Sequence, residues 1–213
     1  RDSWLAIAQV DAGNQEGRIF LAAPLDERDL STLAVEKEVV SWDKDRELVT
    51  ASLEARIGNV VLSTKPLNTL PEEEKVRVLC QAIRENGLSF LNWGEEQTAW
   101  QTRVLSLRTW RPVENWPDVS DQNLLETAQD WLGPFLSSIH KRSEILKLDL
   151  STILNAMLPW ELNAKLPQVA PSRLEVPSGS MIRLIYFSDG RPPIMEVRLQ
   201  EVFGMLETPT VNE

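Results

Sequence analysis

Residues 69–87, TLPEEEKVRVLCQAIRENG, decide the fold class, because they carry a complete helix signal in the middle of the chain. Thr69 and Glu72 have the spacing of a capping box, with Pro71 in the predicted first turn. Apolar residues then recur at helical spacing until Gly87 stops the pattern. This periodicity predicts an amphipathic helix that packs against other helices.

Three more helices are predicted on the C-terminal side. One covers about residues 95–110, with Trp100 on its apolar face. Another starts after Ser120 and ends at Gly133, and the last runs from Asp149 to Pro159. Together with the first helix they make a predicted helical module over residues 67–167.

Residues 1–66 carry five short strand signals and one longer connection with a helical turn, over residues 24–34. The predicted strands are 4–10, 18–23, 35–42, 48–57 and 60–64. Gly58-Asn59 forms a two-residue turn between the last two. Five short strands suit an OB-like small β-barrel. The alternative is an irregular sheet packed on helices.

Residues 168–213 form a short β-rich C-terminal segment, which completes an α+β fold class. The apolar run 181–187 is expected to be buried on both faces, and residues 195–199 alternate as a half-buried strand. A short helical turn is expected at 202–204. Two or three strands are too few to be stable alone. They either pair with the N-terminal strands or belong to a larger sheet that is cut here.

Composition places the chain among ordinary globular proteins of 213 residues and 24.2 kDa. It begins with Arg1 and stops in polar residues, so we expect a truncated fragment. The single cysteine, Cys80, excludes an internal disulfide and fits a reducing, cytoplasmic location. No apolar run approaches the ~18 residues that cross a bilayer, so no membrane partner is expected.

The net charge of −10 and the pI of about 4.8 bear on nucleic-acid binding. Phosphate binding is driven by Lys and Arg, which release counterions from the nucleic acid. A globally acidic chain is therefore a poor stand-alone binder, although a local basic strip within a larger basic protein could still bind. The simpler interpretation of the charge is solubility.

Catalytic and metal motifs are missing from the sequence. There is no Gly-x-x-x-x-Gly-Lys-Ser/Thr phosphate loop and no Gly-x-Ser-x-Gly elbow, and Pro177-Ser178-Gly179-Ser180 is typical of a turn between strands. His140 is the only histidine and cannot form an ordinary zinc site with one distant cysteine. We therefore predict no catalytic residue, metal or cofactor in this chain.

Tryptophan is unusually frequent, with eight residues in the chain. Bases of single-stranded nucleic acid stack on exposed aromatic rings, and the faces of small barrels bind such strands. Trp4 and Trp42 lie in the β region and are the stacking candidates. The alternative is that these rings pack in the core or between modules.

Five basic residues are candidates for phosphate contacts. Arg103 and Arg108 lie along one predicted helix, while Lys141, Arg142 and Lys147 form the densest local patch. The alternative is a solvated rim without a ligand.

Blocks of sequence along nearly the whole chain resemble one helicase family. They are RIFLAAPLD (18–26), Gly58 with VVLS (60–63), Pro66-Leu67, Gly87-Leu88, Trp93, Trp100, LPW (158–160), Ala170-Pro171, VPSGS (176–180), Pro192-Pro193, VRLQE (197–201) with Phe203-Gly204, and Thr208-Pro209. In this order they resemble the HrpB-type subgroup of bacterial DEAH-box ATP-dependent RNA helicases. The last block is the most specific. One departure is Ile185 before Tyr186, where the family usually has an acidic residue.

The resemblance implies a parent with two RecA-like motor domains, followed by accessory domains and a family-specific C-terminal region. This chain resembles the OB-like part and much of that last region, so ATP and Mg would act in the parent's motor domains. The implied partners are those motor domains, single-stranded RNA or DNA, and a protein partner.

Two functions follow as hypotheses. The first is a non-catalytic accessory region that guides single-stranded nucleic acid or holds partners near the motor. The alternative is a protein-interaction or scaffold domain with no nucleic-acid contact of its own. A third, weaker possibility is an unrelated small enzyme. Steep salt dependence of RNA binding separates the first two, because only phosphate contacts release counterions.

Overall fold

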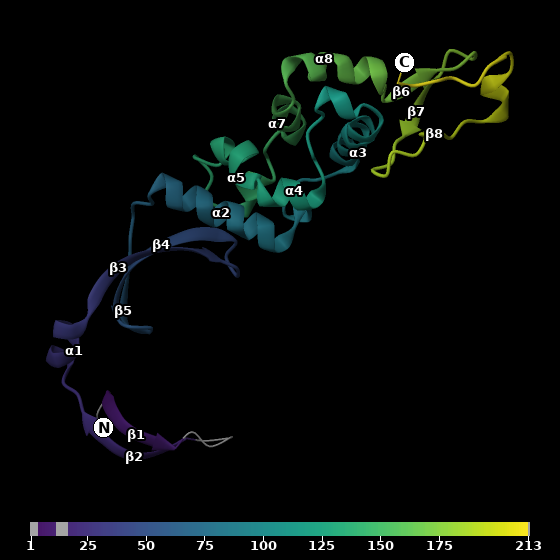
Figure 1. Cartoon of the computed structure of the whole chain (residues 1–213). Helices are drawn as coiled ribbons and strands as arrows, with labels where there is room; N and C mark the ends of the chain where they lie inside the picture. Colours follow the sequence, from purple (N-terminus) through teal and green to yellow (C-terminus); the bar gives the residue numbers. More distant parts are fainter. Residues whose placement is uncertain (1–3, 12–16, 213) are drawn as a thin grey trace. The chain divides into compact units, whose positions relative to one another are not determined.

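The computed structural model describes residues 4–11 and 17–212, and the chain divides into two compact units. Unit 1 comprises Arg1–Ser41 and Thr50–Leu70, and unit 2 comprises Trp42–Val49 and Pro71–Glu213. Helices and strands both contribute, which confirms the mixed class (Figure 1). The division into three modules at residues 66 and 167 stays a prediction.

Unit 1 contains the N-terminal strands and one short helix, close to the predicted positions. Its elements are β1 (Leu5–Asp11), β2 (Arg18–Pro24), α1 (Glu27–Leu33), β3 (Val35–Asp43), β4 (Leu48–Ile57) and β5 (Val60–Pro66), with the tip of the β3–β4 hairpin counted in unit 2. The turn between β4 and β5 is the predicted one: Gly58 has a φ of 58°, and Ile57 pairs with Val60. Five strands and the helical turn are thus confirmed.

The OB-like barrel is not confirmed. Among residues 4–11 and 17–212, the strands form open antiparallel sheets in the orders β1-β2, β3-β4-β5 and β6-β7-β8, and no barrel closes. Closure requires each strand to have a hydrogen-bonded neighbour at both edges. In the described part of the chain β1 and β2 pair only with each other, and most of their side chains are exposed.

Unit 2 is built around a helical core. Its helices are α2 (Glu72–Asn86), α3 (Glu95–Trp110), α4 (Asp121–Glu126), α5 (Ala128–Trp131), α6 (Arg142–Ile145), α7 (Leu150–Met157) and α8 (Trp160–Val169), with short 3-10 turns at Leu88–Phe90, Pro112–Glu114, Gly133–Phe135 and Leu199–Val202. Helix α2 packs on α4 and α5, and α3 packs on α7. Leu79, Ile83, Leu107, Leu124 and Leu154 are fully buried between them.

The ends of the first helices test the sequence signals. Helix α2 ends at Gly87, which has the positive φ of 78° that favours glycine, and α3 has the predicted bounds. The capping box at Thr69 is wrong. The helix starts at Glu72 with Pro71 as its N-cap and without a side-chain cap, so Thr69 lies two residues too early to take that place.

One predicted helix is split, and two helices, α6 and α8, are missed. The helix predicted after Ser120 is split into α4 and α5 at Thr127, which leaves helical geometry while its hydroxyl donates to the carbonyl of Asn123. The sequence analysis ends the last helix at Pro159 and predicts none beyond it, so α8 is missed. Pro159 instead forms the N-cap, and Pro167 lies inside the helix. The short α6 was also missed.

The C-terminal strands form their own small sheet of β6 (Arg173–Glu175), β7 (Met181–Ile185) and β8 (Ile194–Met195), which lies beside α3 (Figure 1). The expectation of a run buried on both faces is wrong: Leu184 faces inward, whereas Met181 and Ile185 are exposed. The strand predicted over 195–199 shrinks to β8, because Leu199 already begins a 3-10 turn.

Contacts with α3 supply the stability that so few strands lack on their own. The hydroxyl of Ser106 donates to the carbonyl of Phe187 at 2.9 Å, and Trp110 Nε1 donates to the carbonyl of Gly190 at 2.5 Å. Gly190 has a φ of 75°, and a Cβ there would lie 2.6 Å from Cγ2 of Thr109. The chain therefore approaches α3 at a point where only glycine fits.

Within the described part of the chain, no helix is long and apolar enough to cross a membrane.

Candidate nucleic-acid interface

Trp42 and Arg142, both predicted to bind nucleic acid, are brought together in unit 2 by Phe90. The Trp42 ring packs edge-on against Phe90 at 5.5 Å between centroids, and the Arg142 guanidinium lies 4.9 Å from the Phe90 centroid. Arg142 Nη1 also pairs with Glu47 at 2.6 Å. The Trp42 ring and the Arg142 charge therefore already have partners inside the protein.

The lysines next to this cluster are exposed. Lys141 pairs with Glu144 at 3.8 Å, and Lys147 has no side-chain partner in the described part of the chain. The backbone N–H of His140 donates to Glu144 and, with the nearby Lys141, lowers the pKa of that carboxyl. An ionised acid thus sits within the densest basic stretch of the sequence and reduces its local charge.

Arg108 and Trp4 each have contacts within their own unit. Arg108 pairs with Asp118 at 3.6 Å, and its Nη1 donates to the carbonyl of Trp116 at 3.4 Å. Trp4 belongs to unit 1, where its half-buried ring borders a hollow that also contains Leu30 and Leu62.

Arg103 is the predicted residue that lines a cleft. This cleft of about 500 Å³ lies in unit 2 between α3, α7 and the strands β6 and β7. Arg103 Nε donates to the carbonyl of Ala170 at 2.6 Å, and Nη2 donates to that of Leu166 at 3.4 Å. Burial lowers the pKa of this guanidinium, but arginine remains charged at neutral pH.

Hydrogen bonds between α3 and α7 hold the cleft in shape. Gln97 Nε2 donates to Ser151 Oγ at 2.9 Å, and Trp100 Nε1 donates to Asn155 Oδ1 at 3.0 Å. Its volume lies within the range of small-molecule and ligand pockets. These bonds fix the two helices that form one wall, so the cleft is a built feature and not a loose gap.

Two further arginines line the same cleft and were missed by the sequence analysis. Arg173 on β6 lies directly opposite Arg183 on β7. Arg183 Nη1 pairs with Glu95 Oε2 at 2.8 Å, and Glu95 also lines the cleft. The two arginines are far apart in sequence, so a search for dense basic stretches passes over them. The signal that identifies them is the turn at 176–180, which folds one strand onto the next.

A second hollow of about 390 Å³ adjoins this cleft, since Glu95 and Arg183 line both. Its other walls include the half-buried Trp93 and the buried Tyr186. Burial raises the pKa of Tyr186 to about 12, although the nearby Arg103 charge acts in the opposite direction. Tyr186 therefore stays protonated and donates to the carbonyl of Pro171 at 2.8 Å.

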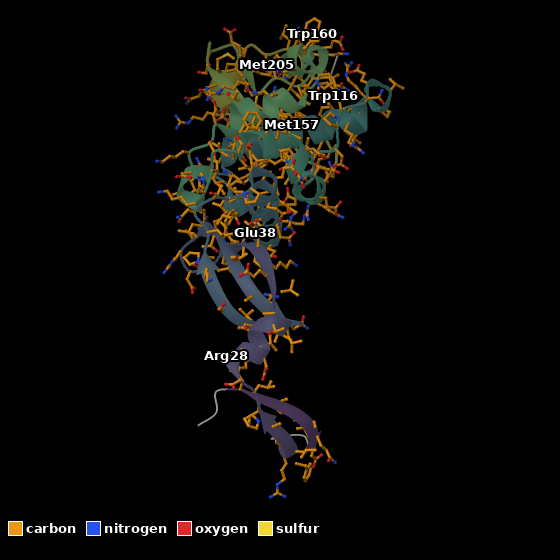
Figure 2. All side chains as sticks on the ribbon, turned by 90° about the vertical axis from the view of Figure 1, so that its left-hand side faces the viewer. Arg28, Glu38, Trp116, Met157, Trp160 and Met205 are labelled. Carbon is orange, nitrogen blue, oxygen red and sulfur yellow. The ribbon has the colours of Figure 1, made fainter. Side chains whose placement is uncertain are left out.

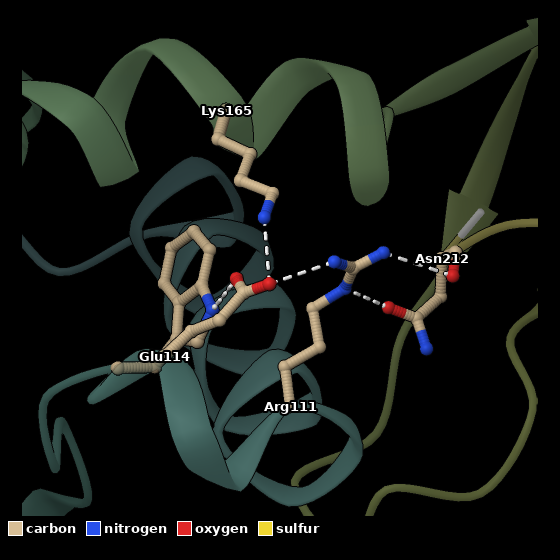
Figure 3. Close-up of polar contacts among 5 residues, drawn as sticks. Arg111, Glu114, Lys165 and Asn212 are labelled. Atoms are coloured by element: carbon tan, nitrogen blue, oxygen red, sulfur yellow. Dashed lines mark hydrogen bonds and ion pairs between the residues drawn. The ribbon is translucent and has the colours of Figure 1, made fainter.

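The middle of α8 is joined to the end of α3 and to the end of the described chain by a polar cluster around Glu114 (Figure 3). Lys165 Nζ and Arg111 Nη1 reach the same Glu114 oxygen at 2.6 and 2.8 Å, and Trp116 Nε1 donates to the other at 3.1 Å. These donors lower the pKa of Glu114 to about 2. Arg111 also donates to the side chain and main chain of Asn212, which fixes the C-terminal segment.

No group of three or more His, Cys, Asp or Glu residues that could hold a metal ion occurs among residues 4–11 and 17–212. Cys80 is buried, and burial raises the pKa of its thiol to about 11. The thiol is therefore protonated at neutral pH and is a poor nucleophile.

Two family models match the chain. The connector region of the ATP-dependent RNA helicase HrpB matches residues 33–67, and the ATP-dependent helicase C-terminal region matches residues 131–213. The chain is also 31% identical, over 219 aligned positions, to the ATP-dependent RNA helicase HrpB of Escherichia coli strain K12. That alignment covers 100% of this chain and 27% of the relative, so the chain spans about a quarter of the relative's length.

Two solved structures have the same fold. The crystal structure of the E. coli DExH-box NTPase HrpB matches with a TM-score of 0.67 and 31% identity, over 98% of this chain and 26% of that one. The crystal structure of the Escherichia coli DEAH/RHA helicase HrpB matches with a TM-score of 0.66 and 29% identity, over 98% and 27%. The sequence of this chain therefore corresponds to the connector and C-terminal regions of the HrpB-type ATP-dependent helicases.

Proposed function

We propose that this accessory region guides single-stranded nucleic acid near the motor domains of a HrpB-type RNA helicase and does not itself hydrolyse ATP. The observation that carries the proposal is the cleft of unit 2, where Arg103, Arg173 and Arg183 gather although the whole chain has a net charge of −10. A local concentration of arginines is what phosphate binding requires. ATP and Mg would bind in the motor domains of the parent.

The other predicted contacts stay secondary candidates. Arg108, Lys141 and Arg142 would have to exchange an acidic partner for a phosphate, while Lys147 is exposed and has no such partner among the described residues. For unit 1 we keep the OB-like barrel as an expectation, because the antiparallel order β3-β4-β5 is the kind of sheet from which such barrels are built. Trp4 would then offer a stacking surface, whereas Trp42 belongs to unit 2 and would have to leave Phe90 to stack on a base.

The test is fluorescence anisotropy of labelled single-stranded RNA, titrated with the chain at low and at physiological salt. We expect binding that weakens steeply with salt. A lack of binding at low salt would contradict the guiding role. An ATPase assay of the same preparation should show no turnover above the background of a chain-free sample, and measurable turnover would refute the non-catalytic assignment.

A second function, holding a protein partner, is favoured by one observation. Large apolar side chains of the C-terminal segment are exposed, with Leu206 at 97%, and Trp160 at the start of α8 is 77% exposed (Figure 2). Exposed apolar patches mark interaction sites. Substituting Phe203 and Leu206 with Ala should weaken association with the separately purified motor domains in size-exclusion chromatography. Val113→Ala, at an equally exposed position, is the control.

A further inference from the structure

We propose that Arg173 and Arg183 form a clamp for backbone phosphates of single-stranded RNA in the cleft of unit 2. The proposal rests on the guiding function proposed above and assigns it to a particular pair of side chains. Neither residue lies in a basic stretch of the sequence, and both line the same 500 Å³ cleft.

The register of the sheet places the two arginines next to each other. Arg173 and Arg183 are directly opposite each other on antiparallel strands, so their side chains leave the sheet on the same face. Like charges in this position destabilise a sheet. In the described part of the chain Arg173 has no acidic partner, whereas Glu95 neutralises only Arg183. An anion between the two guanidinium groups would replace this repulsion with attraction.

Further hydrogen-bond donors line the cleft around the two arginines. Arg103 uses Nε and Nη2 for carbonyls, and no partner of its Nη1 is found among the described residues. Asn155 accepts from Trp100 through Oδ1, and its Nδ2 likewise has no partner there. Both residues line the cleft with the arginine pair. The cleft therefore presents donors from three sides, which suits phosphate oxygens because they accept only.

Glu95 would compete with a phosphate for Arg183. The Glu95 side chain is 87% exposed, so an exposed carboxylate can leave Arg183 at little cost when a phosphate arrives. Glu96 also lines the cleft, so three arginines face two glutamates. We therefore expect modest, salt-sensitive affinity, which Glu95→Gln should increase.

The aromatic residues of the cleft favour a nucleic acid over a folded protein as the occupant. Protein interfaces depend on a central apolar or aromatic anchor in a pocket. Trp100 lines the cleft but is 7% exposed and is bonded to Asn155, so it offers little surface for such an anchor. The adjoining hollow has the half-buried Trp93, where a base next to the clamped phosphate can stack.

The experiment is the anisotropy titration of labelled single-stranded RNA with the 213-residue chain and its Arg173→Glu and Arg183→Gln variants. Each should weaken binding about tenfold at low salt and lower the slope of log K against log salt by about one. Arg77→Glu is the control. It makes the same charge change as Arg173→Glu on the exposed face of α2, where Arg77 pairs with Glu74, and should leave the affinity nearly unchanged.

The outcomes separate the clamp from the guiding function. If the unaltered chain binds RNA and both cleft variants bind equally well, the clamp is refuted while the guiding function stands. If the unaltered chain does not bind at low salt, both the clamp and the guiding function are refuted.

A labelled oligoglutamate is the second probe, and an affinity equal to that of RNA would overturn the assignment to nucleic acid. Thermal melting checks folding. If Arg173→Glu melts early, Arg173→Gln replaces it, and undiminished binding by that variant refutes the clamp.

Discussion

Glu114 is the residue on which several contacts between α3 and α8 converge. Its two oxygens accept from Lys165, Arg111 and Trp116. Replacing it with Gln keeps the shape but removes the charge that makes these bonds strong. We expect Glu114→Gln to lower the free energy of unfolding by about 1–3 kcal/mol at neutral pH. Urea denaturation followed by tryptophan fluorescence measures this difference.

The stabilisation by the Glu114 carboxylate depends on pH. The folded pKa of Glu114, about 2, lies below its ordinary value of 4.5. The stabilisation is therefore complete above the ordinary value and is lost as the pH falls towards about 2. The difference in free energy of unfolding between the native chain and Glu114→Gln should therefore shrink to zero over that pH range. A constant gap would show that the charge is not responsible. Glu207→Gln, at an exposed position outside the helices, is the control.

Arg173 allows stability and binding to be changed in opposite directions. Arg173→Glu replaces a like-charge cross-strand pair with an opposite-charge pair facing Arg183. We expect the free energy of unfolding to rise by about 0.2–1 kcal/mol, since such pairs stabilise sheets by this amount. Thermal or urea unfolding checks it against Arg77→Glu, which breaks a surface ion pair and should not stabilise. A loss of stability in Arg173→Glu would contradict the expected repulsion between the two arginines, and Arg173→Gln would then test the clamp itself.

At the scale of elements, the attachment of the C-terminal sheet to α3 depends on Gly190. Alanine there would be strained at a φ of 75°, and its Cβ would meet Thr109. We expect Gly190→Ala to lower the free energy of unfolding by about 1–3 kcal/mol. Gly179→Ala has a similar φ of 84° with nothing within 4 Å of its Cβ, so it measures the backbone strain alone.

The difference between these two variants is the cost of the contact with α3. Adding Thr109→Ala to Gly190→Ala should recover part of that difference, because it removes the Cγ2 and Oγ1 atoms near the new Cβ. If Gly190→Ala and Gly179→Ala lower the free energy of unfolding equally, the close approach of Gly190 to α3 does not contribute to the effect. Chemical denaturation of the four proteins, including the native chain, completes the comparison.

Elements whose signals are local could be predicted from the sequence. Helix α3 and the Gly58 turn depend on residues within a few positions of each other. Helix α8 could not, because packing holds a helix across Pro167, where local preference opposes one. The arginine pair of the cleft also could not be found from local density, because it depends on the register of β6 and β7. Of the predicted site, only Arg103 lies in that cleft.

For the molecule as a whole, burial is distributed unequally between the units. The strands β1 and β2 of unit 1 are exposed along nearly their whole length, whereas Leu79, Val104 and Leu154 of unit 2 are fully buried. Amide hydrogens of β1 and β2 should therefore exchange orders of magnitude faster than those in the middle of α2 and α3. Hydrogen exchange followed by mass spectrometry measures this. Equal protection of the hairpin and the helices would contradict the exposure seen here.

The charge of the whole molecule opposes the charge of its cleft. A net charge of −10 repels a nucleic acid at long range, whereas the arginines act only at short range. Composition averages the charge over the whole chain, whereas the cleft concentrates three arginines in one place. This contrast explains why composition alone argued against nucleic-acid binding.

Asn212 also bears on the order in which the chain folds. Its backbone N–H donates to the carbonyl of Val169 at 2.8 Å, so residues 170–211 leave the helices and return to the place where they left. The residues that make this closure are synthesised after everything they enclose. The strands β6 to β8 can pair earlier on a growing chain, but their segment stays open at its base until Asn212 arrives. Closing it costs little more entropy than closing a segment half as long, because this cost grows only with the logarithm of length.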